Sequence, residues 1–196
     1  MGKVSAVFAM SLDGYIADAQ DGVWPLFGWL TSGDTPLEVP GVGRPFRTSP
    51  ASAAHYRELL ETFGAEVTGR RDFDVSRAWG GKHPMGVPAF IVTHSPPQEW
   101  VYDGSPFTFV TDGVASAVEQ ARQAAGSKNV IVNGSQIAQQ CLRAGLLDEI
   151  QIELVPILLG AGVRLFDRLG TQPIELETTS VIDAPGVTHL KFRVVK

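Results

Sequence analysis

Short apolar runs alternate with stretches of helical periodicity along most of this chain, and this alternation is the feature that most constrains its fold. Strands are predicted at residues 3–10, 65–68, 89–93, 107–110 and 130–132. One helix is predicted from Ser49-Pro50 to Gly64, a second is capped by Asp112 and ended by Gly126, and a third runs up to Gly145. Alternating strands and helices are typical of a parallel sheet with helices packed against it.

The C-terminal quarter of the chain has a different pattern. Residues 149–159 are predicted as a long strand interrupted at Pro156, and β-rich runs at 174–182 and 187–195 flank Ala184-Pro185-Gly186. The predicted fold class is therefore α/β, with a mostly parallel mixed sheet finished by an antiparallel hairpin. At 196 residues, we expect residues 1–196 to form one domain.

Composition excludes several function classes. The net charge of −5 gives no electrostatic basis for binding nucleic acid or an anionic membrane. The apolar stretch after Lys3 is broken at Ser11 and Asp13, which makes it too short for a signal peptide or a membrane span. A single cysteine, Cys141, cannot form an internal disulfide. We expect a cytoplasmic protein that acts on a small molecule, with no nucleic-acid or membrane partner.

Residues 18–48 form a long segment rich in glycine, proline and aromatic residues. Segments of this length without regular structure are usually lids or binding loops in a compact domain. Trp24, Phe27 and Trp29 would give this loop an apolar inner face.

Glycine and polar residues stand where three predicted strands end. Gly69-Arg70-Arg71 and Asn133-Gly134-Ser135 each precede a helix, and Thr93-His94-Ser95 closes a third strand. Helix N-termini favour anions, arginine side chains match phosphate oxygens, and ligands of open α/β sheets bind at the carboxyl ends of strands. Each tripeptide taken alone also has an ordinary interpretation. The first is compatible with surface arginines, the second with a capped helix start, and the third with an isolated histidine.

Other sites are not supported by the spacing of the residues. There is no phosphate-binding loop of the Walker type, and Gly160-Ala161-Gly162 lacks the third glycine of a dinucleotide fingerprint. The histidines at positions 55, 83, 94 and 189 lack the spacing of metal ligands, so no metal site is predicted. Ser135 is not in a nucleophile elbow, and Cys141 lies on the apolar stripe of its helix.

Several motifs together resemble one known family. They are the segments Met10 to Ala17, Gly69-Arg70-Arg71, Val92 to Ser95, Leu146 to Glu149, and Val155 to Gly162 with Leu165-Phe166. In this order they resemble the dihydrofolate-reductase-like family, which includes the reductase domain of the bifunctional riboflavin-biosynthesis deaminase-reductase. No deaminase domain or zinc signature of such a domain is present in this sequence.

The resemblance implies an NADPH-dependent reductase, often a homodimer, that transfers a hydride to a riboflavin-precursor-like or pterin-like substrate. It places Gly69, Arg70 and Arg71 at the cofactor phosphates, Thr93, His94 and Ser95 near the adenosine, and Gly134, Ser135, Gln136 and Ile137 at the pyrophosphate. It also places Ala9, Ile16 and Ala17 at the nicotinamide, and Asp13, Trp24, Phe27 and Pro156 beside the substrate.

Two departures from the family pattern keep an alternative open. Asp72 adds a carboxylate beside the expected pyrophosphate, and Asn133 stands where the family has glycine. A protein that binds a nucleotide or another small molecule without turnover is therefore the alternative. Asp13 is the candidate for proton handling or substrate anchoring, with an ordinary Asp-Gly turn as its other interpretation.

Overall fold

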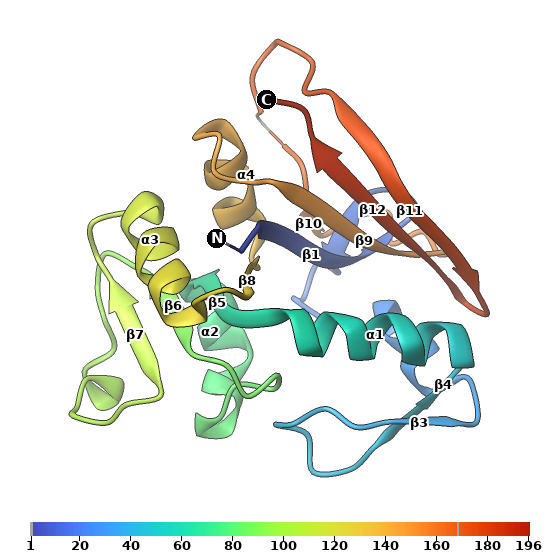
Figure 1. Ribbon diagram of the computed structural model, residues 1–196, viewed down its shortest axis with the longest axis horizontal. Coiled ribbons are helices and arrows are strands. Elements are labelled where there is room, and N and C mark those ends of the chain that lie inside the picture. The colour runs from blue at the N-terminus through green and yellow to red at the C-terminus, as the bar shows by residue number, and fades with distance from the viewer. Residues whose placement is uncertain (1, 168) are drawn as a thin grey trace.

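A twisted sheet of eight strands organises the computed structural model, which describes residues 2–167 and 169–196 (Figure 1). The strand order is β11-β12-β9-β1-β8-β5-β6-β7. From β9 to β7 neighbouring strands are parallel, whereas β12 is antiparallel to both β9 and β11. The bounds are β1 Val4–Ser11, β5 Phe63–Gly69, β6 Ala89–Val92, β7 Phe107–Val110, β8 Asn129–Val132, β9 Glu149–Val155, β11 Leu176–Ala184 and β12 Val187–Val194. The predicted fold class is confirmed.

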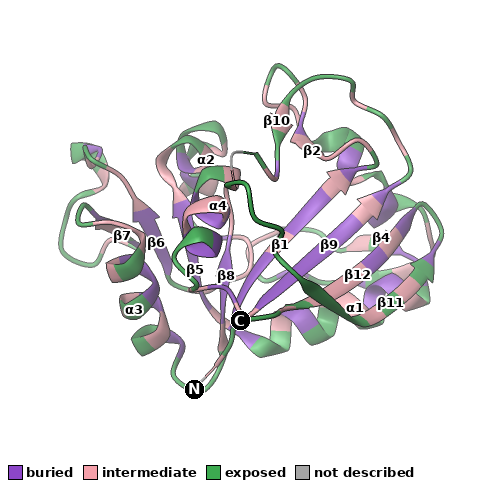
Figure 2. Ribbon diagram, turned by 90° about the horizontal axis from the view of Figure 1, so that it is seen from above, coloured by how far each residue is buried: buried purple, intermediate pink, exposed green. Residues whose placement is uncertain are grey.

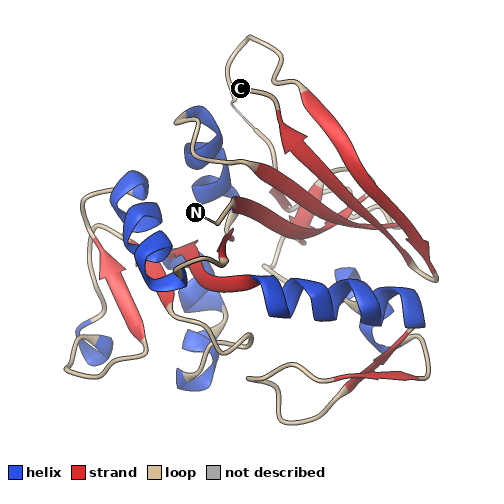
Figure 3. Cartoon of the chain, in the orientation of Figure 1, coloured by secondary structure: helices blue, strands red, loops and turns tan. Residues whose placement is uncertain are grey.

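Helices cover both faces of the sheet (Figure 3). α3 (Val114–Ala125) and α4 (Ser135–Arg143) pack their apolar stripes on one face, against a core that includes Val4, Phe8 and Val67. α1 (Pro50–Thr62) lies across the opposite face, where Leu59 contacts Ile131, and α2 (Arg70–Val75) packs there through Phe73. Cys141 lies on the buried face of α4, in this core, and burial raises the pKa of its thiol to about 12.

The central strands β1, β9 and β6 are buried along most of their length (Figure 2). Several of the buried side chains on the face of the sheet under α1 are polar. Alternate residues of a strand point to opposite faces, so these side chains share a face because they share strand parity. They are Ser5, Glu66, Thr68, Glu149, Gln151, Glu153 and His189. Buried polar groups need partners, so this layer is where specific interactions are expected.

The loop between residues 18 and 48 is more ordered than its sequence indicates. It contains two 3-10 turns, η1 (Trp24–Leu26) and η2 (Gly28–Thr31), and a small hairpin of β3 (Thr35–Leu37) and β4 (Phe46–Thr48). Leu26 and Trp29 are buried in a second apolar core, which also includes Ala9 and Val155. The segment therefore packs on the sheet instead of standing free.

Several predicted boundaries differ from the structure. The first helix ends at Thr62, and the chain enters β5 at Phe63, so Gly64 is a strand residue and not a helix stop. The second helix is preceded by Gly113, not capped by Asp112. β9 ends at Val155, before Pro156, which cannot donate to a strand ladder. The first hairpin strand is shifted by two residues from the predicted 174–182, because β11 runs from Leu176 to Ala184 and the turn is Pro185-Gly186, whereas β12 begins at Val187 as predicted.

Short elements complete the fold. β2 (Tyr15–Ala17) pairs with β10 (Val163–Arg164), and η3 (Arg77–Gly81) and η4 (Gln98–Trp100) lie in connections. Gly162 explains the Gly160-Ala161-Gly162 motif, since a Cβ atom there would lie 2.0 Å from the Ala17 carbonyl oxygen. Among residues 2–167 and 169–196, no helix has both the length and the apolar character needed to cross a membrane.

Candidate cofactor site at the strand ends

The three predicted junctions lie on neighbouring strands. β8, β5 and β6 are adjacent and parallel, so their carboxyl ends meet at one edge of the sheet. Asn133-Gly134-Ser135 follows β8, Gly69-Arg70-Arg71 follows β5, and Thr93-His94-Ser95 follows β6. Sequence alone predicts each junction separately; the strand order places them side by side.

Two glycines form a narrow cradle at this edge. Gly134 has φ +79°, and a Cβ atom there would lie 3.5 Å from both the amide nitrogen of Gly69 and the hydroxyl of Thr68. A Cβ atom on Gly69 would lie 3.2 Å from the side chain of Ile137. Side chains at either position would fill this space, so glycine here keeps backbone amides accessible.

Helix starts supply the hydrogen-bond donors of the cradle. α4 begins at Ser135 directly after Gly134, and no side chain caps it. Its first free amides belong to Ser135, Gln136 and Ile137, while Ala138 already donates to the Gly134 carbonyl. Unsatisfied amides and the helix dipole favour an anion at this position. These residues therefore fit the pyrophosphate of a dinucleotide cofactor.

Both arginines at the β5 junction are held by protein partners. Arg71 makes a bidentate ion pair with Asp21 of the 18–48 loop, at 2.7 and 2.9 Å. Arg70 pairs with Asp74 and donates to the Ser95 carbonyl at 2.6 Å, which links α2 to the loop after β6. A phosphate at this edge would compete with these contacts.

Asp72 sits just beneath the cradle. Its carboxylate accepts a hydrogen bond of 2.8 Å from Thr68, the same hydroxyl that borders Gly134. Burial raises the pKa of Asp72 to about 6, and the Glu66 carboxylate adds to this rise, while the Thr68 hydroxyl and His83 oppose it. Near neutral pH the charge at this position therefore depends on pH.

The remaining cofactor candidates lie in three places: after β6, on β2 and on β1. Thr93 and Ser95 bond to each other in a tight turn, and His94 is exposed beside them. Ile16 and Ala17 lie on β2, where Ala17 is buried against β10. Ala9 is buried beneath the second apolar core with Leu26 and Trp29, so the 18–48 loop covers it in this structure.

Asp13 holds a neighbouring loop in place. Its carboxylate accepts hydrogen bonds from the Ser11 hydroxyl and from the backbone amides of Leu159 and Gly160. The hydrogen bond from Ser11 is the largest influence and lowers the pKa of Asp13 to about 2; desolvation opposes it, and the amides of Gly160 and Leu159 lower the pKa further. Asp13 is thus an anion at neutral pH, which favours an anchoring role over proton donation. The loop that Asp13 holds begins at Pro156, which is exposed.

The aromatic candidates of the 18–48 loop separate in the structure. Trp24 is 73% exposed, and Phe27 is half-buried at the margin of the second apolar core. Trp29 is buried and packs against Tyr56 and His189. Contact of Trp24 and Phe27 with a substrate stays a prediction.

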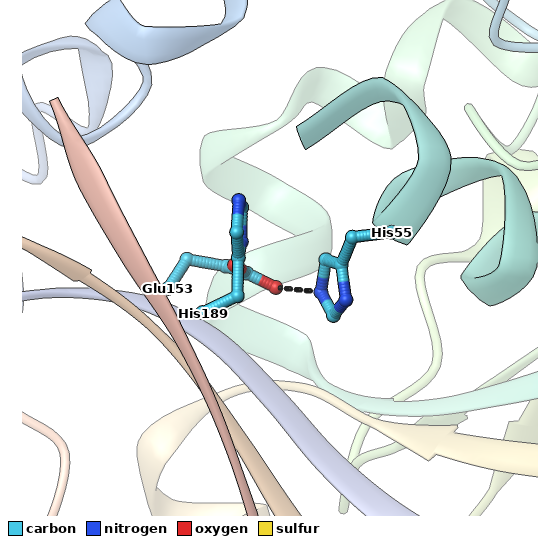
Figure 4. A group of neighbouring side chains, drawn as sticks. All are labelled: His55, Glu153 and His189. Atoms are coloured by element: carbon cyan, nitrogen blue, oxygen red, sulfur yellow. Dashed lines mark hydrogen bonds and ion pairs between the residues drawn. The ribbon is translucent and has the colours of Figure 1, made fainter. Parts of the chain in front are cut away.

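Sequence spacing did not reveal a group of buried ionisable residues under α1. His55, Glu153 and His189 meet there, although 98 positions separate His55 from Glu153 (Figure 4). Burial alone would raise the pKa of Glu153, but hydrogen bonds from His189 and His55 outweigh it and lower that pKa. The sequence holds one indication of this group: the alternation of residues along each strand places the side chains of Glu153 and His189 on a buried face of the sheet.

Comparison with known proteins decides the family. Residues 2–190 match the family described as the RibD C-terminal domain. This chain belongs to the RibD C-terminal domain family. A curated relative, the uncharacterized protein YwjB of Bacillus subtilis (strain 168), is 24% identical over 168 residues, which cover 85% of this chain and 84% of that protein.

Solved structures of riboflavin-biosynthesis proteins share the fold. A candidate riboflavin biosynthesis protein of Shewanella sp. PV-4 superimposes with a TM-score of 0.75 at 22% identity, covering 99% of both chains. A deaminase/reductase of Thermotoga maritima has a TM-score of 0.64 at 12% identity, and covers 99% of this chain and 57% of its own. The riboflavin biosynthesis reductase of Saccharomyces cerevisiae has a TM-score of 0.58 at 13% identity, covering 99% of this chain and 90% of its own.

Proposed function

We propose that this protein is an NADPH-dependent reductase that transfers a hydride to a small heterocyclic substrate of the riboflavin-precursor or pterin type. The observation that carries the proposal is the cradle of Gly69 and Gly134 at the start of α4. Its position at the carboxyl ends of parallel strands is where nucleotides bind in α/β sheets. Membership of the RibD C-terminal domain family supports a reductase.

In this proposal the chain binds, orients and shields the reactants, and NADPH supplies the hydride when bound. Amides of Ser135, Gln136 and Ile137 hold the pyrophosphate, and Arg70 and Arg71 turn from Asp74 and Asp21 to phosphate oxygens. Thr93, His94 and Ser95 border the adenosine. Ala9, Ile16 and Ala17 contact the nicotinamide once the 18–48 loop moves from Ala9.

Asp13 keeps the substrate side of the site in shape. Its carboxylate fixes the amides of Leu159 and Gly160, and through them the loop that begins at Pro156. A group with a pKa of about 2 carries no proton at neutral pH, so the proton that accompanies hydride transfer comes from another donor. Trp24 and Phe27 border the substrate from the loop.

A thermal melt with NADPH, and with NADH as control, tests the cofactor. At 100 times its dissociation constant a ligand stabilises by about 2.7 kcal/mol, which corresponds to a rise of roughly 5 to 10 °C in Tm for a chain of this length. We expect this rise with NADPH, a much smaller one with NADH, and its loss in Gly134→Val. No rise with either nucleotide would overturn the proposal.

A protein that binds nucleotide without turnover is the second candidate. It is favoured by Asp72 beneath the cradle and by the ion pairs that occupy Arg70 and Arg71. Loss of NADPH absorbance that depends on an added pterin or aminopyrimidine distinguishes the two candidates. Binding without any such loss across a panel of these compounds would favour the second.

We also propose a cytoplasmic homodimer. The single cysteine, Cys141, is a buried free thiol, as expected for a reducing compartment. β11 is an edge strand with exposed Leu176 and Val181, and a second copy could cover it. Light scattering of the eluted protein tests the dimer, and Val181→Lys is expected to shift it toward the monomer.

A further inference from the structure

His55, Glu153 and His189 form a compact set of ligand atoms between α1 and the sheet. One ring nitrogen from each histidine and one carboxylate oxygen all lie within 4.8 Å of one another. The three residues come from α1, β9 and β12, and Glu153 and His189 are directly opposite in the β9–β12 ladder. Figure 4 shows the His55 ring facing the Glu153 carboxylate, and His189 hydrogen-bonds to the other oxygen of that carboxylate.

The burial of this set distinguishes it from a surface ion pair. The side chains of Glu153 and His189 are 5% and 1% exposed, and that of His55 is 12% exposed. The two imidazole centroids are only 4.3 Å apart. Protonating both rings would place two like charges at that distance in the interior, which is costly. A divalent cation coordinated by two neutral imidazoles and the carboxylate would satisfy all three groups together.

One contact in the set is close to the spacing of ligands on a small transition-metal ion. His55 Nε2 lies 2.9 Å from Glu153 Oε1. Ligands about 2.0 to 2.2 Å from a tetrahedral zinc ion are about 3.3 Å from one another, so the group needs to open by only tenths of an ångström at this contact. An ion would replace the hydrogen bonds of Glu153 with His55 and His189. Two imidazoles favour zinc or a similar metal over magnesium or calcium.

An outer partner orients one of the ligands. His189 Nε2 lies 2.9 Å from the hydroxyl of Ser52, which is itself 3.1 Å from the hydroxyl of Ser49 at the start of α1. In this structure Nδ1 of His189 donates to the Glu153 carboxylate. With Nε2–H donated to Ser52 instead, the lone pair of Nδ1 would face a bound ion. Metal-binding histidines characteristically use their second nitrogen in this manner.

Space for a fourth ligand adjoins the set. A polar cavity of about 320 Å³ opens between α1, β9, β12 and β11, and its walls include His55 and His189. Three protein ligands with an adjoining polar cavity match zinc sites that keep one position for water or another small ligand. We propose that His55, Glu153 and His189 bind one Zn²⁺ ion, which ties α1 to β9 and β12.

Zinc binding can be tested on the whole protein independently of its activity. After treatment with EDTA and removal of the chelator, the protein is titrated with ZnCl2, and the bound metal is counted after dialysis. We expect one ion per chain and a rise of roughly 5 to 10 °C in Tm at saturating zinc. Substoichiometric binding with no rise in Tm would show a hydrogen-bonded triad only and overturn the proposal.

Single substitutions assign the ion to these residues. His55→Ala is expected to weaken zinc binding by about 100-fold or more, and Ser52→Ala by about 10- to 100-fold. His94→Ala removes an exposed histidine that follows β6, which three strands separate from β9, and it is expected to bind zinc like the parent protein. Equal losses in His55→Ala and His94→Ala, or no loss in His55→Ala, would contradict the assignment.

A spectroscopic probe needs no substitution. Co²⁺ replaces Zn²⁺ in most such sites, and its visible absorption reports its coordination number. We expect the intense bands of a four-coordinate ion, displaced by one equivalent of ZnCl2. The weak spectrum of hexa-aqua Co²⁺ would overturn the proposal even if every variant failed to fold.

Discussion

Replacing Asp72 with asparagine should stabilise the protein above pH 6 and leave it unchanged near pH 4. The native pKa of Asp72 is about 6, raised from 3.8 mainly by burial and then by Glu66. Because the native state binds this proton more tightly than the unfolded state, its stabilising effect is complete below pH 4. It is lost as the pH rises through 6. Asparagine does not titrate and can still accept the hydrogen bond from Thr68.

The expected gain follows from the size of the pKa shift. Each pKa unit corresponds to about 1.4 kcal/mol, so a shift of roughly two units limits the gain to about 3 kcal/mol. Partial access of water to this side chain reduces it, and we expect about 1 to 3 kcal/mol at pH 7.5. In a chain of this length that is a rise of roughly 3 to 10 °C in Tm.

Chemical denaturation of both proteins at pH 4 and pH 7.5 measures the effect. Asp74→Asn is the matched control in the same helix, since Asp74 is exposed and makes only a surface ion pair with Arg70. That pair is worth at most about 1 kcal/mol, so the control should be slightly less stable at pH 7.5. Equal stability of Asp72→Asn and the parent protein at pH 7.5, or an equal gain at pH 4, would refute the reasoning.

Further predictions concern the cradle, the anchor loop, the β2–β10 contact and the core. Gly134→Ala is expected to lower the free energy of unfolding by about 1 to 3 kcal/mol, because alanine at this φ is strained, and also to weaken NADPH binding. Unchanged denaturant and NADPH titrations would contradict this. Asp13→Asn should lower activity without changing the shape of its pH profile above about pH 5, and loss of a profile limb in that range would refute the anchoring role. Gly162→Ala should cost about 1 to 3 kcal/mol more than Gly160→Ala, since only the Gly162 Cβ would meet backbone; equal unfolding free energies would disprove this. Cys141 should react with a thiol reagent only after unfolding, and rapid labelling of the native protein would be the contrary result.

The order of strands and helices was largely readable from the sequence. Buried strands appear as continuous apolar runs, and helices as stripes with Ser49, Gly126 and Gly145 near their ends. Local chemistry also placed glycine at the junctions that became the cradle. These predictions agree with the structure because backbone propensity and hydrophobic periodicity act over a few neighbouring residues.

Tertiary structure decided what those residues meet. Strand order, which depends on contacts between distant segments, set Gly69 beside Gly134 and buried Ala9 under Leu26 and Trp29. Element boundaries differ from the predicted ones where packing outweighs local signals. Gly64, for example, is predicted to end the first helix but lies in β5.

The partners of the ionisable residues were likewise beyond sequence reasoning. Asp13 anchors a loop because the chain at Leu159 folds back to it. Arg71 pairs with Asp21, which lies 50 positions away in the sequence. His55, Glu153 and His189 meet only because α1 crosses the face on which the two strand residues point. The sequence by itself determined the α/β elements and their junction residues, because short-range forces specify these. Only the packed sheet decided which charges are buried and paired, because that depends on contacts between segments far apart in the chain.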